Sequence, residues 1–320
     1  MDRGESKQDR SIFLTSMTTK VFITGGSGLL ALNWALAIRE SHAVTLCLHE
    51  RMISLAGVQT QKMELEPVED LVRTFDDARI SMVVHAAGFT NVEKCEAKPD
   101  LARHTNVELA GNVAKACAKL GLPLIHISTD HLFSGEIPML AESSPVTPVN
   151  VYGRTKAEAE LHVLKAHPLA LLIRTNFYGW GTSYRRSFSD VIIEALRSGK
   201  DLNLFTDVFY TPILVDTVAI AAHDLIDTKV TGIVNIVGDE RISKYEFGIR
   251  IAEEFGLGAG LIKPGLLADQ VALVQRPYDM SLSNQKISKL LGRKLGGVSE
   301  HLSGLHKQEK NGFSQEMRSL

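Results

Sequence analysis

Short runs of apolar residues alternate with longer amphipathic segments through the first half of the chain. Four of these runs are rich in Val and Ile and are bounded by turn residues, a pattern typical of buried strands. They span residues 20–24, 43–48, 81–85 and 122–128. The segments between and after them have helical character and span residues 28–39, 67–77, 99–120 and 151–166. A weaker pattern at residues 61–66 indicates a further strand.

This alternation predicts the fold class. Strand–helix–strand units need crossover connections, so the strands should form a parallel sheet with helices on both faces. We therefore expect an α/β fold with a Rossmann-type doubly wound sheet over residues 18–175. The less regular residues 176–305 are expected to form a smaller mixed α/β substrate-binding lobe, interleaved with the first domain. The polar residues 1–17 and 306–320 predict a disordered extension and a flexible tail.

Composition excludes several classes of protein. The 320 residues are 44% hydrophobic and 22% charged, with a formal net charge of −2, so nothing favours nucleic acid or an acidic membrane surface as a partner. No apolar run approaches the roughly 20 residues of a membrane span. Three cysteines without CxxC spacing indicate a reducing compartment. We expect a cytoplasmic protein and leave a homodimer open.

A glycine cluster follows the first predicted strand. Residues 24–31 read TGGSGLLA, and Gly25 and Gly28 allow the backbone to turn tightly and approach a pyrophosphate. The helix that follows offers unpaired N–H groups to that anion. In this strand–turn–helix setting the cluster predicts a dinucleotide site. The alternative is a plain glycine-rich turn.

The end of the second predicted strand bears on the choice of cofactor. A carboxylate there hydrogen-bonds the ribose 2′-hydroxyl of NAD, whereas a cation accepts the 2′-phosphate of NADP. The chain has His49, Glu50 and Arg51 at this place. Arg51, together with His49, favours NADP, and Glu50 leaves NAD open. A solvated loop arginine is the alternative interpretation of Arg51.

The only Tyr-x-x-x-Lys of the chain pairs Tyr152 with Lys156. On a helix, positions four apart share a face, and we expect the ammonium to lower the pKa of the phenol from its usual value near 10. Tyr152 would then act as an acid–base group. Thr129 ends the preceding strand, where its hydroxyl can hydrogen-bond a substrate carbonyl, and Ser128 is an adjacent candidate. Taken alone, the Tyr/Lys pair is also typical of a surface helix.

Taken together, these motifs resemble the extended short-chain dehydrogenase/reductases, and within them most closely the dTDP-4-dehydrorhamnose reductases. The resemblance covers about residues 19–295. It rests on the stretches VFITGGSGLL, VVHAAGFTNVEKCEAKPDLARHTNV, HISTDHLFSG, YGRTKAEAE, IRTNFYGWG, TDVFYTPILVDTVA, GIVNIVGDERISKYEF and RPYDMSLSNQKISKLLG.

The resemblance implies roles for matching residues. Tyr152 would be the proton donor, Lys156 its pKa modulator and a ribose ligand, and Thr129 the hydroxyl that polarises the carbonyl. Tyr152 and Lys156 are also expected to contact the cofactor. The other expected cofactor ligands are Gly25, Ser27, Gly28, Leu29, His49, Arg51, Glu64, Leu65, Ala86, Ala87, Gly88 and Asn106. The expected substrate ligands are Thr90, His131, Asn176, Arg185 and Arg186, the two arginines having a solvated charge pair as their alternative.

The function implied is NAD(P)H-dependent reduction of a nucleotide-linked 4-keto-deoxysugar. Relatives usually carry Tyr where this chain has His131, and often Trp in the stretch that here reads Asn176-Phe177-Tyr178. These departures leave the identity of the sugar substrate undetermined. A nucleotide-sugar epimerase of the same superfamily and a non-catalytic NADP-binding regulatory subunit are the alternatives. The eleven histidines lack zinc-like spacing, so no metal is expected.

Overall fold

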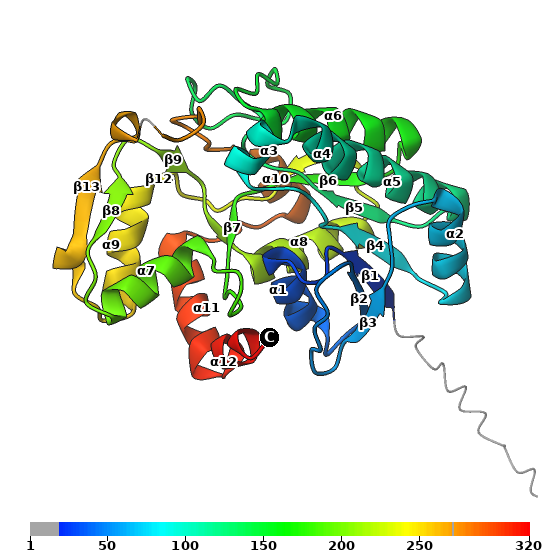
Figure 1. Cartoon of the computed structure of the whole chain (residues 1–320), viewed down its shortest axis with the longest axis horizontal. Coiled ribbons are helices and arrows are strands. Elements are labelled where there is room, and N and C mark those ends of the chain that lie inside the picture. The colour runs from blue at the N-terminus through cyan, green and yellow to red at the C-terminus, as the bar shows by residue number, and fades with distance from the viewer. Residues whose placement is uncertain (1–18, 271) are drawn as a thin grey trace, which may run out of the picture.

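The computed structural model describes residues 19–270 and 272–320, so the predicted extension over residues 1–17 lies outside the described residues. Seven strands form one parallel sheet in the order β11-β6-β5-β4-β1-β2-β3 (Figure 1). Their bounds are β1 Lys20–Thr24, β2 Ala43–Leu48, β3 Gln59–Lys62, β4 Met82–His85, β5 Leu124–Ile127, β6 Leu171–Arg174 and β11 Gly232–Asn235. The predicted α/β fold with a Rossmann-type parallel sheet is confirmed.

Helices cover both faces of this sheet. One face carries α1 Leu29–Ile38 and α8 Val215–Asp227, and the other carries α2 Val68–Asp77, α5 Leu109–Leu120 and α6 Val151–Ala166. Along each strand, successive residues enter opposite cores: Ile23 packs on the α1 side and Phe22 on the α5 side. Because both faces are buried, the strands are continuous apolar runs in the sequence.

The segment predicted as one helix over residues 99–120 is divided in the structure. After the short α3 Val92–Ala97 come α4 Pro99–Arg103 and a π-helical turn, η1 His104–Glu108, before α5 begins. Asn106 lies in this turn and is buried. Single π-helical turns inside α-helices are frequent at functional sites, and this one lies beside the site described below.

After β6 the chain builds the smaller lobe, at the left in Figure 1. Its larger elements are α7 Phe188–Arg197, β8 Leu202–Phe205, α9 Lys244–Glu254 and β13 Ile262–Gly265. Its shorter elements and the connections to the large sheet are β7 Phe177–Tyr178, β9 Phe209–Tyr210, β10 Ile213–Leu214, β12 Ile242–Ser243, η2 Ala259–Leu261, η3 Leu267–Asp269 and α10 Gln285–Leu291. Between β8 and β13 the chain returns to the large sheet through α8 and β11, so the two parts are interleaved in sequence.

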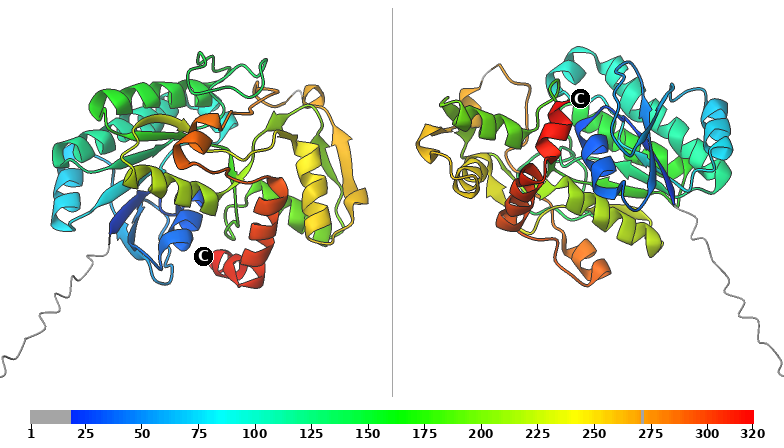
Figure 2. Two further views of the ribbon diagram at one scale, coloured as in Figure 1. Left: turned by 180° about the vertical axis from the view of Figure 1, so that it is seen from behind. Right: turned by 90° about the horizontal axis from the view of Figure 1, so that it is seen from below.

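The prediction of a flexible tail over residues 306–320 is wrong. α11 Val298–Lys310 and α12 Phe313–Arg318 occupy this end of the chain, and Met317 is fully buried. Arg39, at the end of α1, donates hydrogen bonds of 2.5 and 3.0 Å to the Glu316 carboxylate, so α12 lies against the Rossmann half (Figure 2). The indole of Trp180 also donates to the Leu305 carbonyl, at 3.1 Å. The C-terminal end of the chain is thus held by contacts with segments more than 100 residues earlier in the sequence.

Three further observations concern the described residues as a whole. None of their helices is long and apolar enough to cross a bilayer. No three His, Cys, Asp or Glu side chains in this part of the chain are arranged to hold a metal ion. The three cysteines are buried thiols, and burial raises the pKa of Cys47 to about 12 and that of Cys95 to about 11, which makes them poor nucleophiles.

Candidate active site

Two adjoining cavities lie at the carboxyl edge of the large sheet. Strand order reverses between β1 and β4, and ligands of doubly wound sheets bind at such a reversal. The Tyr152 cavity has a volume of about 480 Å³ and the Gly25 cavity about 370 Å³, each named for a residue that lines it. The residues that line both are Gly28, Ala86, Ala87, Gly88 and Arg185.

The glycine turn after β1 makes a tightly packed floor for the Gly25 cavity. Gly25 has a φ of +69°, and a Cβ there would lie 2.8 Å from the backbone of Ala87. A Cβ on Gly26 would lie 2.7 Å from the Cβ of Leu46. The Thr24 hydroxyl accepts hydrogen bonds from the N–H groups of Ala86 and Ala87, at 3.1 and 3.2 Å. Only glycine fits this backbone, and β1 is fixed to the chain that follows β4.

The start of α1 suits an anion. Gly28 is its N-cap residue, so no side chain caps the helix, and its first turn holds no acidic residue. The N–H groups of the first turn therefore face the cleft without an intrahelical partner, and the helix dipole favours a negative group there. With the glycine floor beneath it, this geometry fits the pyrophosphate of a dinucleotide.

The far end of the Gly25 cavity is lined by His49, Glu64 and Leu65. The His49 Nε2 lies 3.1 Å from the Glu64 carboxylate. Arg51 does not line the cavity: its guanidinium lies over the ring of Tyr184, 3.9 Å from the ring centroid. The assignment of Arg51 to a 2′-phosphate therefore stays a prediction.

Tyr152 and Lys156 both line the Tyr152 cavity from the first turns of α6. The helix is started by Asn150, whose side-chain oxygen accepts from the N–H of Gly153 at 2.8 Å. The Lys156 Nζ donates to the carbonyl of Ile127, at the end of β5, at 2.7 Å. This bond fixes the ammonium at the end of β5, two residues before Thr129.

The expected lowering of the Tyr152 pKa is wrong for this structure. Burial raises the pKa of Tyr152 to about 12, although a hydrogen bond with the Thr129 side chain works in the opposite direction. Burial also lowers the pKa of Lys156 to about 8, against the Glu160 carboxylate, which raises it. Desolvation is the largest cause of both shifts, because both side chains are enclosed by the fold.

Thr129 and Ser128 have different roles in the structure. The Ser128 hydroxyl donates to Glu160 at 2.6 Å, and Glu160 also accepts two hydrogen bonds from the buried Arg174 guanidinium, at 2.9 and 2.7 Å. Ser128 is thus engaged in joining β5, α6 and β6. The Thr129 hydroxyl donates a long hydrogen bond of 3.3 Å to Asp130. That leaves Thr129 as the better placed hydroxyl for a ligand.

His131 and Asn176 complete the inner part of the Tyr152 cavity. The His131 ring meets the Tyr152 ring edge-on, with centroids 5.6 Å apart. Burial lowers the pKa of His131, so the imidazole is neutral at neutral pH. The Asn176 side-chain amide donates to the buried Asp130 carboxylate. The inner part of the cavity therefore offers a neutral imidazole and an amide, with the Asp130 carboxylate behind the amide.

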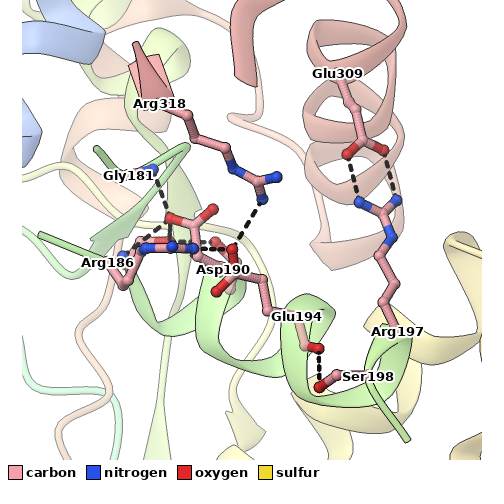
Figure 3. A network of polar contacts seen from close by, with 10 residues as sticks. Gly181, Arg186, Asp190, Glu194, Arg197, Ser198, Glu309 and Arg318 are labelled. Atoms are coloured by element: carbon pink, nitrogen blue, oxygen red, sulfur yellow. Dashed lines mark hydrogen bonds and ion pairs between the residues drawn. The ribbon is translucent and has the colours of Figure 1, made fainter. Parts of the chain in front are cut away.

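The outer wall of the cleft comes from the loop before α7. Arg185 donates through Nη2 to the Thr90 hydroxyl at 2.9 Å. Arg186 pairs with Glu194 on α7, and Glu194 also lies 3.3 Å from Arg318 of α12 (Figure 3). The wall is thereby tied to the C-terminal helix.

The structure brings together all the expected site residues except two. Arg51 lies on Tyr184, and Asn106 lies behind the site, where its Oδ1 accepts from the N–H of Phe89 at 2.7 Å and its amide donates to Thr155 at 3.0 Å. The lining residues that the sequence did not single out include Glu93, Asp130, Phe188 and Arg276. Glu93, Asp130 and Arg276 stand in the quoted stretches VVHAAGFTNVEKCEAKPDLARHTNV, HISTDHLFSG and RPYDMSLSNQKISKLLG, which was the available signal; Phe188 stands in none of the quoted stretches.

Known proteins are similar to this chain in sequence and in fold. Residues 19–310 match the family described as RmlD substrate binding domain. The probable low-salt glycan biosynthesis reductase Agl14 of Haloferax volcanii is 29% identical over 89% of this chain and 96% of its own. The mouse methionine adenosyltransferase 2 subunit beta is 29% identical over 85% of this chain and 82% of its own. A dTDP-4-dehydrorhamnose reductase from Bacillus anthracis, solved in complex with NADP, has a TM-score of 0.80 and 22% identity over 91% of this chain and 100% of its own.

Proposed function

Because the chain belongs to the RmlD substrate binding domain family, we propose that it is an NADPH-dependent reductase of a nucleotide-linked 4-keto-deoxysugar, with NADH as an alternative reductant. The observation that carries the proposal is the junction of the two cavities. A floor that fits a dinucleotide opens directly into a cavity lined by Thr129, Tyr152 and Lys156.

The Gly25 cavity would hold the cofactor. Gly25, Ser27, Gly28 and Leu29 would contact its pyrophosphate through their backbone, and Lys156 its ribose. When bound, the reduced cofactor supplies the hydride for the ketone carbon. Support comes from the glycine floor, from the uncapped start of α1 and from the NADP-bound structure of the Bacillus anthracis reductase.

Thr129 and Tyr152 would hydrogen-bond the ketone oxygen. With a pKa of about 12, Tyr152 holds its proton at neutral pH, and an alkoxide is a far stronger base than a phenolate. The proton therefore moves from Tyr152 to the oxygen as the ketone is reduced. The ammonium of Lys156 would then stabilise the phenolate. In the reductive direction, the raised pKa of Tyr152 favours the acid form that the reaction needs.

The remaining residues of the Tyr152 cavity would position the nucleotide sugar. Thr90, His131, Asn176, Arg185 and Arg186 all line it. A neutral His131 beside the Tyr152 ring offers a hydrogen bond to a sugar oxygen without adding a further charge near the phenol. Holding the ketone and the cofactor at reacting distance contributes much of the acceleration in such reactions.

A screen of nucleotide-linked 4-keto-6-deoxysugars with NADPH and with NADH tests the proposal. Loss of absorbance at 340 nm and the reduced sugar product are to be measured together. The proposal expects at least one substrate to consume reductant in a 1:1 ratio to product. A product formed with no net consumption would replace it by an epimerase, and no turnover on any substrate would contradict it.

A regulatory subunit is the second candidate, because a protein named as a subunit of methionine adenosyltransferase is as similar in sequence as the reductase relative. Binding of NADP to such a subunit need not lead to turnover, since a fold does not fix a function. Purification of the tagged chain from its own cells distinguishes the two. Stoichiometric recovery of a larger enzyme together with absent ketone reduction would favour the subunit.

A further inference from the structure

Residues 181–187, here named the strap, cross from the smaller lobe to the Rossmann half between β7 and α7. The base of the strap is closed by the buried Asp190, whose Oδ2 accepts from the N–H groups of Gly181 and Ser187, at 2.5 and 3.0 Å (Figure 3). Inside it, the N–H of Thr182 donates to the Arg185 carbonyl at 2.9 Å. A Cβ on Gly181 would lie 2.5 Å from that carbonyl. The strap is therefore a built turn with a defined tip.

The tip of the strap contacts the dinucleotide floor. The Tyr184 hydroxyl donates to the carbonyl of Ser27, in the glycine turn, at 2.9 Å. The guanidinium of Arg51, after β2, lies over a face of the Tyr184 ring. Together with the Arg185–Thr90 hydrogen bond, these contacts fix the tip across the Gly25 cavity.

Arg185 occupies a distinctive place at this tip, because it is the only charged residue that lines both cavities within the described part of the chain. Its neighbour Arg186 is paired with Glu194, and Arg276 is paired with Glu93. Arg185 itself forms no ion pair with a carboxylate among residues 19–270 and 272–320; its one side-chain hydrogen bond there goes to the Thr90 hydroxyl. Its charge reaches the reacting group, since Arg185 lowers the pKa of Tyr152 against the larger effect of burial.

We propose that Arg185 is a shared anion-binding residue, which binds a phosphate of the dinucleotide on one side and the diphosphate of the nucleotide substrate on the other. The proposal rests on the proposed function. Two diphosphates in adjoining cavities repel each other, and a cation between them removes much of that repulsion. A guanidinium has five N–H donors in a rigid fork. Arg185 can therefore bind two oxyanions at once when its hydrogen bond to the neutral Thr90 hydroxyl is broken. Each ligand then raises the affinity for the other, and the coupling is equal in both directions.

Isothermal titration calorimetry with NADP⁺ and dTDP as probes measures this coupling without turnover. The dissociation constant of dTDP is measured with and without saturating NADP⁺, and the reverse pair is measured as a check of reciprocity. Because hydrogen bonds to charged groups are the strong ones, we expect Arg185→Gln to weaken each ligand alone by about tenfold. In the wild type, bound NADP⁺ should raise the affinity for dTDP. In Arg185→Gln, the factor by which NADP⁺ raises this affinity should be at least about fivefold smaller.

Arg186→Gln is the matched control, because Arg186 lines the Tyr152 cavity but not the Gly25 cavity. It is expected to weaken dTDP alone and to leave NADP⁺ binding and the coupling within twofold of the wild type. Arg185→Lys keeps the charge without the fork and should restore part of the coupling. Unchanged thermal midpoints show that the variants are folded.

Failure of this proposal and failure of the proposed function give different results. If the wild type binds both probes and Arg185→Gln leaves the coupling unchanged, Arg185 is not shared, whatever the enzyme reduces. If Arg185→Gln weakens only one probe, the residue belongs to one ligand and the proposal is overturned. If the wild type binds NADP⁺ but neither dTDP nor UDP, a nucleotide-linked substrate is excluded first, and the shared role of Arg185 fails with it.

Discussion

The two sides of the cleft are built by different means. The floor under the Gly25 cavity is defined by backbone: a glycine at φ +69°, a Cβ-free approach to Ala87 and an uncapped helix start. The opposite wall, the strap and its neighbours, is defined by long side chains such as Tyr184, Arg185 and Arg186. A backbone floor tolerates few substitutions, whereas a side-chain wall can change its ligand with single residues. The difference predicts that cofactor binding is sensitive to the floor and substrate choice to the wall.

Removal of the proton donor should have the largest effect. Tyr152→Phe keeps the ring that packs beside His131 but removes the hydroxyl, so kcat is expected to fall by about 10³-fold, within the range general acid catalysis provides. The dissociation constant of NADPH, followed by fluorescence, should change less than about threefold, because that binding depends on the floor. A variant that keeps near-wild-type turnover would remove Tyr152 from the chemistry.

A substitution in the floor should come next. Gly25→Ala puts a Cβ 2.8 Å from the Ala87 backbone at a φ of +69°, so the turn must shift and NADP⁺ binding should weaken by at least about tenfold. Gly199→Ala is the matched control, since Gly199 has a φ of +68° but a Cβ added there would meet no atom within 4 Å. Gly199→Ala should lower the thermal midpoint and leave NADP⁺ binding unchanged. Equal effects of the two variants on binding would show that the floor needs no close approach.

The pH dependence follows from Lys156. Its pKa of about 8 predicts that kcat/KM for reduction is constant below pH 8 and falls about tenfold per unit above it, as the ammonium is lost. The stability of the protein changes with pH in the opposite direction. Between about pH 8 and pH 10.5 the native state binds fewer protons at Lys156 than the unfolded state does, so the contribution of Lys156 to the free energy of unfolding rises with pH. Denaturant titrations of the wild type and of Lys156→Met across this pH range measure the contribution of Lys156 to the free energy of unfolding.

Lys244 is the control for this assignment. Burial lowers its pKa to about 7, and it lies near Asp130, whose charge raises it. Lys244→Met should keep the decline in kcat/KM near pH 8. If the decline disappears in Lys244→Met, the titrating group is Lys244 and the assignment to Lys156 is wrong.

The smallest effect concerns the attachment of the wall to the C-terminal helices. Arg197 on α7 donates hydrogen bonds of 2.7 and 2.8 Å to Glu309 on α11 (Figure 3). Both side chains are partly exposed, so a double-mutant cycle with Arg197→Gln and Glu309→Gln should give a coupling energy of at most about 1 kcal/mol. NADP⁺ binding should not change. A larger loss of binding would mean that the wall's position depends on this pair.

The sequence predicted the floor better than the wall for a physical reason. Strands such as Met82–His85 and the turn at Gly25 depend on local sequence, because both faces of the sheet are buried and the turn needs particular residues in order. The wall and α12 depend on contacts between distant segments, such as Arg39 with Glu316 and Tyr184 with Ser27. No local pattern encodes such contacts, so the segment over residues 306–320 was predicted to be flexible.

The direction of the Tyr152 pKa could not be predicted for a related reason. The four-residue spacing to Lys156 is visible in the sequence, but the degree of burial is a property of the assembled fold. Desolvation, which depends on that burial, determines the sign here. The gathering of the candidate residues at one edge of the sheet was therefore predictable, and their electrostatics were not.

The central claim is that a hydride passes from the ligand of the Gly25 cavity to a ketone in the Tyr152 cavity. The most direct test follows the isotope with NADPH deuterated at the transferring position of nicotinamide C4 and a nucleotide-linked 4-keto-6-deoxysugar. Mass spectrometry should find one deuterium on the former ketone carbon of each product molecule, and none there when only the solvent is deuterated. Deuterium from D₂O at the former ketone carbon, or product without label from the reductant, would contradict the account.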